Sequence, residues 1–290
     1  MKWKGGRRST NVRDARGERV VRTAGAGALL HLVGRRFGLT GILVLVGIVG
    51  VLWLTGLVDP SAFLGGPVQT RSEPYQPSPE EQELFDFVTV ILGYTEDTWS
   101  AEFRQRGAQY TEPELVIYTE AVNTGCGLGQ SAMGPFYCPA DRSIYVDLGF
   151  YDELEQTFQA PGDFAQAYVL AHEVGHHVQT LLGTSQKVHA MRGRPDYNQF
   201  SVRLELQADF YAGLWARDNQ RYLDHGDIEE AMRAANAIGD DAIQGRVRGR
   251  IMPHTFTHGT SEQRMRWFNK GLSTGRMEEG DTFSLPYDRL

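Results

Sequence analysis

The stretch His172-Glu173-Val174-Gly175-His176 constrains the fold of this chain more than any other part of the sequence. It follows the pattern H-E-x-x-H, and on an α-helix positions i and i+4 lie on one face. Apolar residues recur at helical spacing through this region, so we predict a helix over residues 163–182 with Asp163 as its N-cap. Two imidazoles on one face can hold a metal ion, and the Glu173 carboxylate is placed to act on a water molecule there.

A second motif, Glu205-Leu206-Gln207-Ala208-Asp209, lies on a predicted helix over residues 201–219. A metal site on an H-E-x-x-H helix needs a third protein ligand from elsewhere in the chain, and Glu205 can supply it. Asp209 follows one helical turn later, where it can accept a hydrogen bond from a ligand histidine and orient the ring. The small residues Ala208 and Gly213 would let the two helices approach closely. Alternatively, this is an ordinary amphipathic helix with solvated carboxylates.

Charge is distributed unevenly along the chain. Residues 1–36 contain ten Lys or Arg and two acidic residues, a charge of +8, whereas the whole chain carries −7. The remainder therefore carries −15, which argues against nucleic-acid binding by the globular part. Because large apolar residues are few in residues 1–36, we predict a disordered basic arm there.

Residues 37–58 form an uncharged apolar run that is long enough to cross a bilayer as a helix. Arg35 and Arg36 precede it, so the positive-inside rule predicts a single-pass membrane protein with a cytoplasmic N-terminus and an extracytoplasmic C-terminal part. A buried soluble helix and a cleaved signal peptide are the alternatives. The run is long for either, and no A-x-A-type cleavage site follows it. Proline-rich residues 59–79 are predicted to be a linker, and residues 80–290 the globular domain.

The globular part is predicted to contain a few short strands and many helices. Strands are expected at residues 114–119, 131–137 and 143–148, the last two forming a hairpin. Helices are expected from near Ser78 to about Leu92 and at about 95–106, 150–159, 227–244 and 261–270, with a loop at 184–200. The outer strand of the hairpin could line the cleft beside the metal helix and pair with an extended peptide.

Cys126 and Cys138 are the only cysteines of the chain. In a compartment outside the cytoplasm two cysteines predict a disulfide, and closing this loop would contribute about 2–3 kcal/mol of stability. The alternative is two free buried thiols. The pair lacks the close spacing of a C-x-x-C metal site.

Four blocks of the sequence resemble a family of bacterial neutral zinc metallopeptidases whose members carry one N-terminal transmembrane helix. The blocks, which lie within residues 78–285, are Gly134-Pro135-Phe136-Tyr137-Cys138-Pro139-Ala140-Asp141, His172-Glu173-Val174-Gly175-His176-His177-Val178-Gln179, Glu205-Leu206-Gln207-Ala208-Asp209 and His258-Gly259-Thr260-Ser261-Glu262-Gln263-Arg264. More distantly, the pattern is similar to the gluzincin metallopeptidases. The resemblance implies an α+β, zincin-like domain, mostly helical with a small mixed sheet whose edge strand lies over the metal helix.

In this interpretation Zn²⁺ is the cofactor and a peptide or protein is the substrate. His172, His176 and Glu205 hold the metal, Glu173 is the catalytic base and Asp209 orients a ligand histidine. The predicted function is zinc-dependent hydrolysis of peptide bonds, in the manner of an endopeptidase, because no terminus-binding site is evident.

The second half of the chain offers candidates for the group that stabilises the oxyanion. Thr257-His258 resembles a T-H segment of membrane-linked gluzincins whose histidine faces the active site, so His258 is the first candidate. A surface or structural role is the alternative for His258. Tyr211 and Arg264 are further candidates. His177 points off the ligand face of its helix and is expected to be structural.

Two other classes of function fit parts of the sequence. One is a catalytically silent, metal-containing domain that binds peptides or cell-envelope components. The other is a membrane-anchored structural protein without a metal. An intact Glu173 argues against the silent domain, because a metal site without catalysis needs no base at that position.

Overall fold

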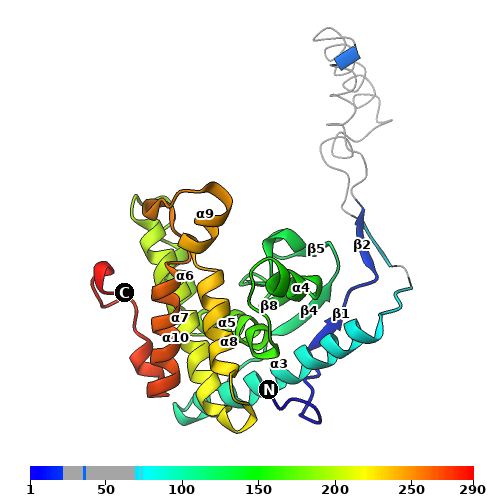
Figure 1. Ribbon diagram of the computed structural model, residues 1–290, viewed down its shortest axis with the longest axis horizontal. Coiled ribbons are helices and arrows are strands. Elements are labelled where there is room, and N and C mark those ends of the chain that lie inside the picture. Colours follow the sequence, from blue (N-terminus) through cyan, green and yellow to red (C-terminus); the bar gives the residue numbers. More distant parts are fainter. Residues whose placement is uncertain (22–34, 37–68, 73) are drawn as a thin grey trace, which may run out of the picture. The chain divides into compact units, whose positions relative to one another are not determined.

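The computed structural model describes residues 1–21, 35–36, 69–72 and 74–290. These residues form two compact units, one of Met1–Arg16 with Gln76–Leu290 and one within Gly17–Tyr75. The larger unit contains a four-stranded mixed sheet and is otherwise mostly helical (Figure 1). The predicted α+β class is therefore confirmed, and the gluzincin assignment within that class stays a prediction.

The larger unit has short strands and a long helical second half. Its strands are β1 (Val12–Asp14), β4 (Glu114–Tyr118), β5 (Ala121–Thr124), β6 (Gly127–Gln130), β7 (Phe136–Cys138) and β8 (Ser143–Asp147). Its α-helices are α3 (Pro79–Gln105), α4 (Gly149–Gln156), α5 (Asp163–Leu181), α6 (Thr184–His189), α7 (Tyr197–Asp218), α8 (Asp227–Ala237), α9 (Asp240–Arg248) and α10 (Ser261–Thr274). In the smaller unit, β2 (Glu18–Val21) pairs with β3 (Gln69–Ser72) in an antiparallel ladder.

The main sheet has the order β1-β4-β8-β7. β4 and β8 are parallel and lie at its centre, which is why Leu115 to Tyr118 are all buried and apolar. β7 pairs antiparallel with β8 and forms an edge of the sheet, as the predicted hairpin requires. The outer strand is shorter than expected because residues 131–133 form a single turn of 3₁₀-helix.

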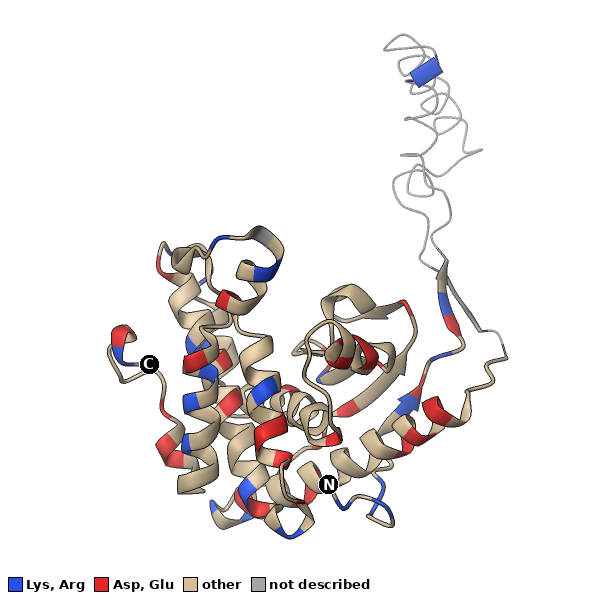
Figure 2. Ribbon diagram, in the orientation of Figure 1, with Lys and Arg blue, Asp and Glu red and all other residues tan. Residues whose placement is uncertain are grey.

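The prediction of a disordered arm is wrong for Met1–Arg16, which is part of the larger, globular unit. β1 pairs in parallel with β4 at the edge opposite β7. The basic residues that precede it pair with acidic residues of α3: Lys4 with Glu83 at 2.7 Å, Arg8 with Asp86 at 2.6 Å and Arg7 with Glu96 at 2.8 Å. Figure 2 shows this meeting of basic segment and acidic helix. The composition of residues 1–36 predicted disorder because it contains no information about the complementary acidic surface on α3.

α3 is one continuous helix where the sequence predicted two. It begins as expected, with Ser78 and Glu81 forming a reciprocal capping box. Gly93 lies within this helix and permits contact with the N-terminal segment. A Cβ atom at Gly93 would lie 2.4 Å from the carbonyl oxygen of Arg7. The glycine therefore serves close packing and does not end the helix.

The helices of the second half pack closely through small residues. A Cβ atom on Gly175 of α5 would lie 3.0 Å from the carbonyl oxygen of Ala208 on α7, so these two helices are nearly in backbone contact. Ala208 thus acts as predicted. Gly213 does not, because it faces α10, where its Cβ would meet the carbonyl oxygen of Phe268.

Three other local predictions are corrected. Gly162 is the N-cap residue of α5, and Asp163 makes no side-chain capping bond because its carboxylate accepts from the Met1 nitrogen at 3.0 Å. The expected loop 184–200 contains α6. The expected helix 227–244 is divided into α8 and α9 near Gly239, where a Cβ would lie 2.5 Å from the Ser261 nitrogen.

The predicted transmembrane segment, residues 37–58, lies outside the described residues. Within the described part of the chain, no helix combines the length and apolar character needed to cross a membrane. Of the predicted linker 59–79, residues 69–72 form β3 and Pro79 begins α3. Membrane attachment therefore stays a prediction.

The contact at Gly93 predicts the sign of a stability change. In an isolated helix Gly→Ala stabilises by about 0.5–1 kcal/mol. Here Gly93→Ala should destabilise the protein, because the new methyl group displaces the Arg7 carbonyl. Gly245→Ala is the matched control, since this glycine lies within α9 with open space around its Cβ position. Urea denaturation and hydrogen exchange of residues 1–14 measure both effects. A stabilised Gly93→Ala variant would contradict the observed packing.

Candidate metal centre

Three potential metal ligands converge between α5 and α7. The Nε2 atom of His172 lies 3.3 Å from Glu205 Oε2, and the Nε2 atom of His176 lies 3.5 Å from Glu205 Oε1. The ligand atoms of all three residues lie within 4.8 Å of one another. Two imidazole nitrogens and one carboxylate oxygen are the donor set of many catalytic zinc sites. These residues therefore fit a zinc ion in kind and in position.

Hydrogen bonds to the other ring nitrogens fix how the two histidines present Nε2. The Nδ1 atom of His172 lies 2.8 Å from Asp209 Oδ1, as the sequence predicted. The Nδ1 atom of His176 lies 2.9 Å from Gln179 Oε1. When both Nδ1 atoms carry the proton, both Nε2 lone pairs face Glu205 and are available for a metal.

Asp209 is the centre of a buried polar network. Its fully buried carboxylate also accepts hydrogen bonds from Tyr168 Oη at 2.6 Å and from Arg264 Nε at 2.9 Å. Although burial opposes ionisation, Arg264 and His172 lower the pKa of Asp209. The carboxylate is thus held charged beside His172. Arg264 contributes to this network, so its guanidinium is engaged with Asp209 and is not a free oxyanion donor.

Gln179 connects His176 to the helix that carries Glu205. Its Nε2 donates to the carbonyl oxygen of Leu204 at 2.7 Å and to Gln207 Oε1 at 3.2 Å. One amide group therefore orients a ligand histidine and holds the backbone next to the third ligand. Gln179 was not among the predicted site residues, although its position three residues after His176 on a helix favours contact between the two side chains.

Ionisation at the site favours metal binding by Glu205. Although burial opposes it, His176 and His258 hold the pKa of the Glu205 carboxyl well below its usual range. Burial raises the pKa of the neighbouring Glu173 carboxyl. His176 and His172 partly offset this increase. Glu173 is buried and lines the same cleft as the three candidate ligands. A carboxylate with a raised pKa is suited to accept and later release a proton.

The cleft at the candidate ligands has a volume of about 560 Å³. One wall is the segment 132–137, which ends in the edge strand β7, and another comes from the region around His258. Apolar side chains also line this cleft; they are Phe150, Phe158, Val169, Ile238 and Ile243. The cleft therefore joins a strand edge, the candidate metal ligands and an apolar surface.

His258 lies in this cleft and not in the core. Its side chain is 50% exposed, and its Nδ1 atom lies 3.3 Å from Asp240 Oδ1. The carboxylates of Glu205 and Asp240 raise the pKa of His258, which favours its protonated, hydrogen-bond-donating form. The loop is held in place because Asp240 accepts the backbone N–H groups of Thr257 and His258.

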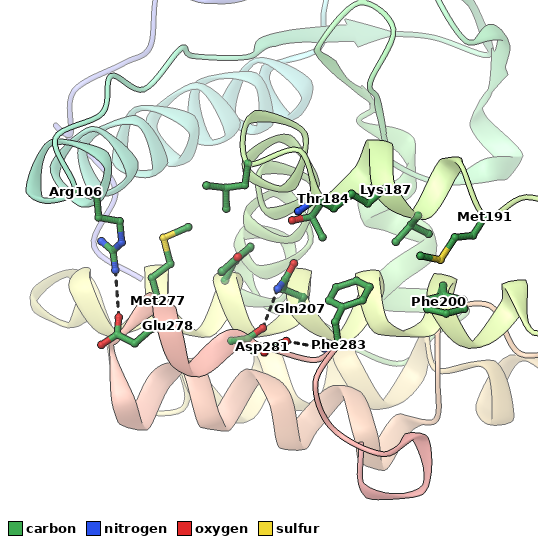
Figure 3. Close-up of a pocket in the computed structure, with 14 residues that line it drawn as sticks. Arg106, Thr184, Lys187, Met191, Phe200, Gln207, Met277, Glu278, Asp281 and Phe283 are labelled. Carbon is green, nitrogen blue, oxygen red and sulfur yellow. Dashed lines mark hydrogen bonds and ion pairs between the residues drawn. The ribbon is translucent and has the colours of Figure 1, made fainter.

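Tyr211, the other oxyanion candidate, faces a different cavity. Figure 3 shows this second cavity, of about 600 Å³, with Phe200 and Gln207 of α7 on one side and Met277 on another. Tyr211 lines it together with these residues and does not line the cleft at His172. The structure thus separates Tyr211 from the candidate metal centre.

His177 has the structural role that the sequence predicted. It is fully buried, its Nε2 donates to the carbonyl oxygen of Thr111 at 2.6 Å, and its Nδ1 accepts from Tyr137 Oη at 3.1 Å. It therefore attaches α5 to the strand β7 that borders the cleft. Burial lowers the pKa of His177 to about 4.

The predicted disulfide between Cys126 and Cys138 is present. Cys138 is the last residue of β7, and Cys126 lies in the turn between β5 and β6. The bond thus ties the edge strand to the neighbouring hairpin. It restricts the strand that forms one wall of the cleft.

Comparison with known families agrees with this geometry. The sequence profile of the family described as "Putative neutral zinc metallopeptidase" matches residues 1–283. The chain belongs to this family. The match includes the N-terminal segment, in keeping with its place in the globular unit.

Several bacterial proteins are similar to this chain. A protein of Escherichia coli strain K12, named "Uncharacterized protein YpfJ", is 46% identical over 290 residues, which cover 98% of this chain and 99% of that protein. A protein of Mycobacterium bovis, named "Uncharacterized protein Mb2605", is 44% identical over 188 residues, which cover 60% of this chain and 64% of that protein. No solved structure matches the chain.

The low pKa of His177 predicts a stability change in mild acid. Below about pH 6.5 the unfolded chain binds a proton at this residue that the folded protein does not bind. The free energy of unfolding should therefore fall between about pH 6.5 and pH 4, by at most about 1.4 kcal/mol per pH unit. The variant His177→Gln should lose less stability than the native protein between pH 7 and pH 5. Equal pH dependence of both proteins in urea denaturation would contradict this role.

Proposed function

We propose that this protein is a zinc-dependent endopeptidase whose metal is held by His172, His176 and Glu205. The observation that carries the proposal is the convergence of these three side chains beside a buried carboxylate in an open cleft. A purely structural zinc site is closed by four protein ligands, whereas three ligands in a cleft leave a position for water or substrate. Zn²⁺, when bound, supplies a Lewis acid that activates water and polarises a carbonyl group.

Glu173 is proposed as the base. Its carboxylate accepts a proton from the attacking water and delivers it to the nitrogen of the departing amine. The buried position of Glu173 supports this role, because burial raises its pKa and favours holding the proton between the two steps. Asp209 and Gln179 act through the histidines, whose rings they orient.

His258 is proposed as a donor to the oxygen of the scissile carbonyl. It lines the cleft, is half exposed and has a raised pKa beside Glu205 and Asp240. A protonated imidazole there can donate a hydrogen bond to an oxygen that gains negative charge in the transition state. Arg264 and Tyr211 are not needed for this step.

The substrate is proposed to be an extended peptide that pairs with β7. This strand is the edge of the main sheet, and its segment forms a wall of the cleft beside the candidate ligands. Backbone pairing with an edge strand positions a peptide largely independently of its sequence. The apolar side chains around Phe150 and Ile243 would then receive a substrate side chain.

Replacing the proposed base separates catalysis from metal binding. Glu173→Gln should retain zinc and lower kcat by about 10²–10⁴-fold, because the amide cannot accept the proton. The matched control is Glu153→Gln, the same change at an exposed residue of the same cleft. Cleavage of a diverse peptide library, read by mass spectrometry with and without a chelator, measures activity. Elemental analysis of the same samples measures zinc.

Three results of this experiment are distinguishable. Zinc with cleavage that Glu173→Gln abolishes supports the proposal. Zinc without cleavage by the native protein favours a silent domain that binds peptides or envelope components. A folded, zinc-free protein that acquires no zinc on addition of the metal would contradict the proposed centre.

A further inference from the structure

We propose that Met1–Arg16 and Gln76–Leu290, the two parts of the larger unit, lie on the same side of the membrane. The proposal differs from the single-pass topology that the sequence predicted. That topology places the N-terminus in the cytoplasm and the globular unit beyond the membrane. Two separate features of the described residues oppose it.

The first feature is the pairing of β1 with β4 inside the main sheet. Val12, Arg13 and Asp14 are in register with Leu115, Val116 and Ile117. Backbone hydrogen bonds to β4 continue beyond both ends of β1. Leu115 N donates to Asn11 O at 2.8 Å, and Ala15 N donates to Ile117 O at 2.7 Å. A strand that shares backbone hydrogen bonds with a sheet must lie in the same compartment as that sheet.

The attachment extends beyond the strand and is well buried. The backbone nitrogen of Ser9 donates a hydrogen bond to the carbonyl oxygen of Thr89 at 2.9 Å. The Ser9 hydroxyl donates a hydrogen bond to the carboxylate of the buried Glu96. Ala15 is 1% exposed. The Arg7 carbonyl occupies the space that Gly93 leaves open. The N-terminal segment is therefore a packed part of the globular unit.

The second feature is the antiparallel ladder between β2 and β3. Glu18 is in register with Ser72, and Val21 with Gln69. Paired residues in such a ladder lie about 5 Å apart, whereas the hydrocarbon core of a bilayer is about 30 Å thick. Val21 and Gln69 therefore cannot lie on opposite sides of a membrane while they are paired.

The sequence between these strands does not provide two crossings. A helical crossing needs about 20 predominantly apolar residues, and residues 37–58 are the one run of that length between positions 22 and 68. One complete crossing would leave β2 and β3 on opposite sides. A single crossing between these strands is therefore incompatible with the ladder.

The positive charge of the N-terminal segment has another explanation in the fold. Lys4, Arg7 and Arg8 contribute to the positive charge of this segment. In the structure these residues form ion pairs with carboxylates of α3. Their charge is complementary to the globular unit and does not require a cytoplasmic N-terminus. The disulfide favours a position outside the cytoplasm for the whole unit.

Labelling of single cysteines in the full-length chain tests the proposal. Thr10→Cys reports on the N-terminal segment and Ala108→Cys on the globular unit, and both positions are exposed. A membrane-impermeant maleimide is added to membrane vesicles of known orientation, with the chain lacking an added cysteine as the blank. We expect both positions to react in one orientation and both to be shielded in the opposite one. Reaction of the two positions in opposite orientations would overturn the proposal.

A second measurement keeps the proposal testable if a cysteine variant does not fold. Carbodiimide treatment of intact membranes should join Lys4 to Glu83, whose charged atoms lie 2.7 Å apart, and Lys4→Gln removes this cross-link. Mass spectrometry of the digested band identifies it. Absence of the cross-link in the native chain would contradict the same-side arrangement. Recovery of the full-length chain only in the soluble fraction would contradict the placement of the chain at a membrane.

Discussion

The close approach of α5 and α7 at Gly175 and Ala208 is the contact on which the rest of the candidate centre depends. Because Gly175 has no side chain, its backbone lies close to that of Ala208, within one helical turn of the ligands. This distance lets the short Glu205 side chain reach both histidine rings. A larger residue at position 175 would move the helices apart and separate the third ligand from the other two.

The buried charges around Asp209 also require that α5 and α7 pack in this arrangement. A buried carboxylate is costly unless its hydrogen bonds are satisfied, and removing one partner of such a group typically costs about 3–5 kcal/mol. Asp209 lies on α7 and has donors from two other helices: Tyr168 and His172 on α5 and Arg264 on α10. The network can form only in one arrangement of these helices. It therefore adds specificity to the packing and fixes the ring of a ligand histidine.

Local patterns predicted the centre better than they predicted its surroundings. H-E-x-x-H and the later E-x-x-x-D are helical spacings, so His172, His176, Glu205 and Asp209 could be brought together from the sequence. Gln179 was not predicted, although its partner His176 lies three residues before it on the same helix. Tyr168 was not predicted because its partner Asp209 lies on another helix. The N-terminal segment was misjudged for the same reason, since its sheet partner β4 is a hundred residues away in the chain. The close approach of Gly93 to Arg7 could not be predicted either, because the two residues are far apart in the sequence.

The central claim is that a zinc ion is bound by two imidazoles and one carboxylate. X-ray absorption at the zinc edge of the purified full-length chain tests it most directly. We predict one zinc per chain with nitrogen and oxygen neighbours at about 2.0–2.2 Å, two of them imidazoles, and loss of tight zinc binding in Glu205→Ala. Absence of zinc from the folded protein, or a coordination shell that is unchanged in Glu205→Ala, would contradict the account.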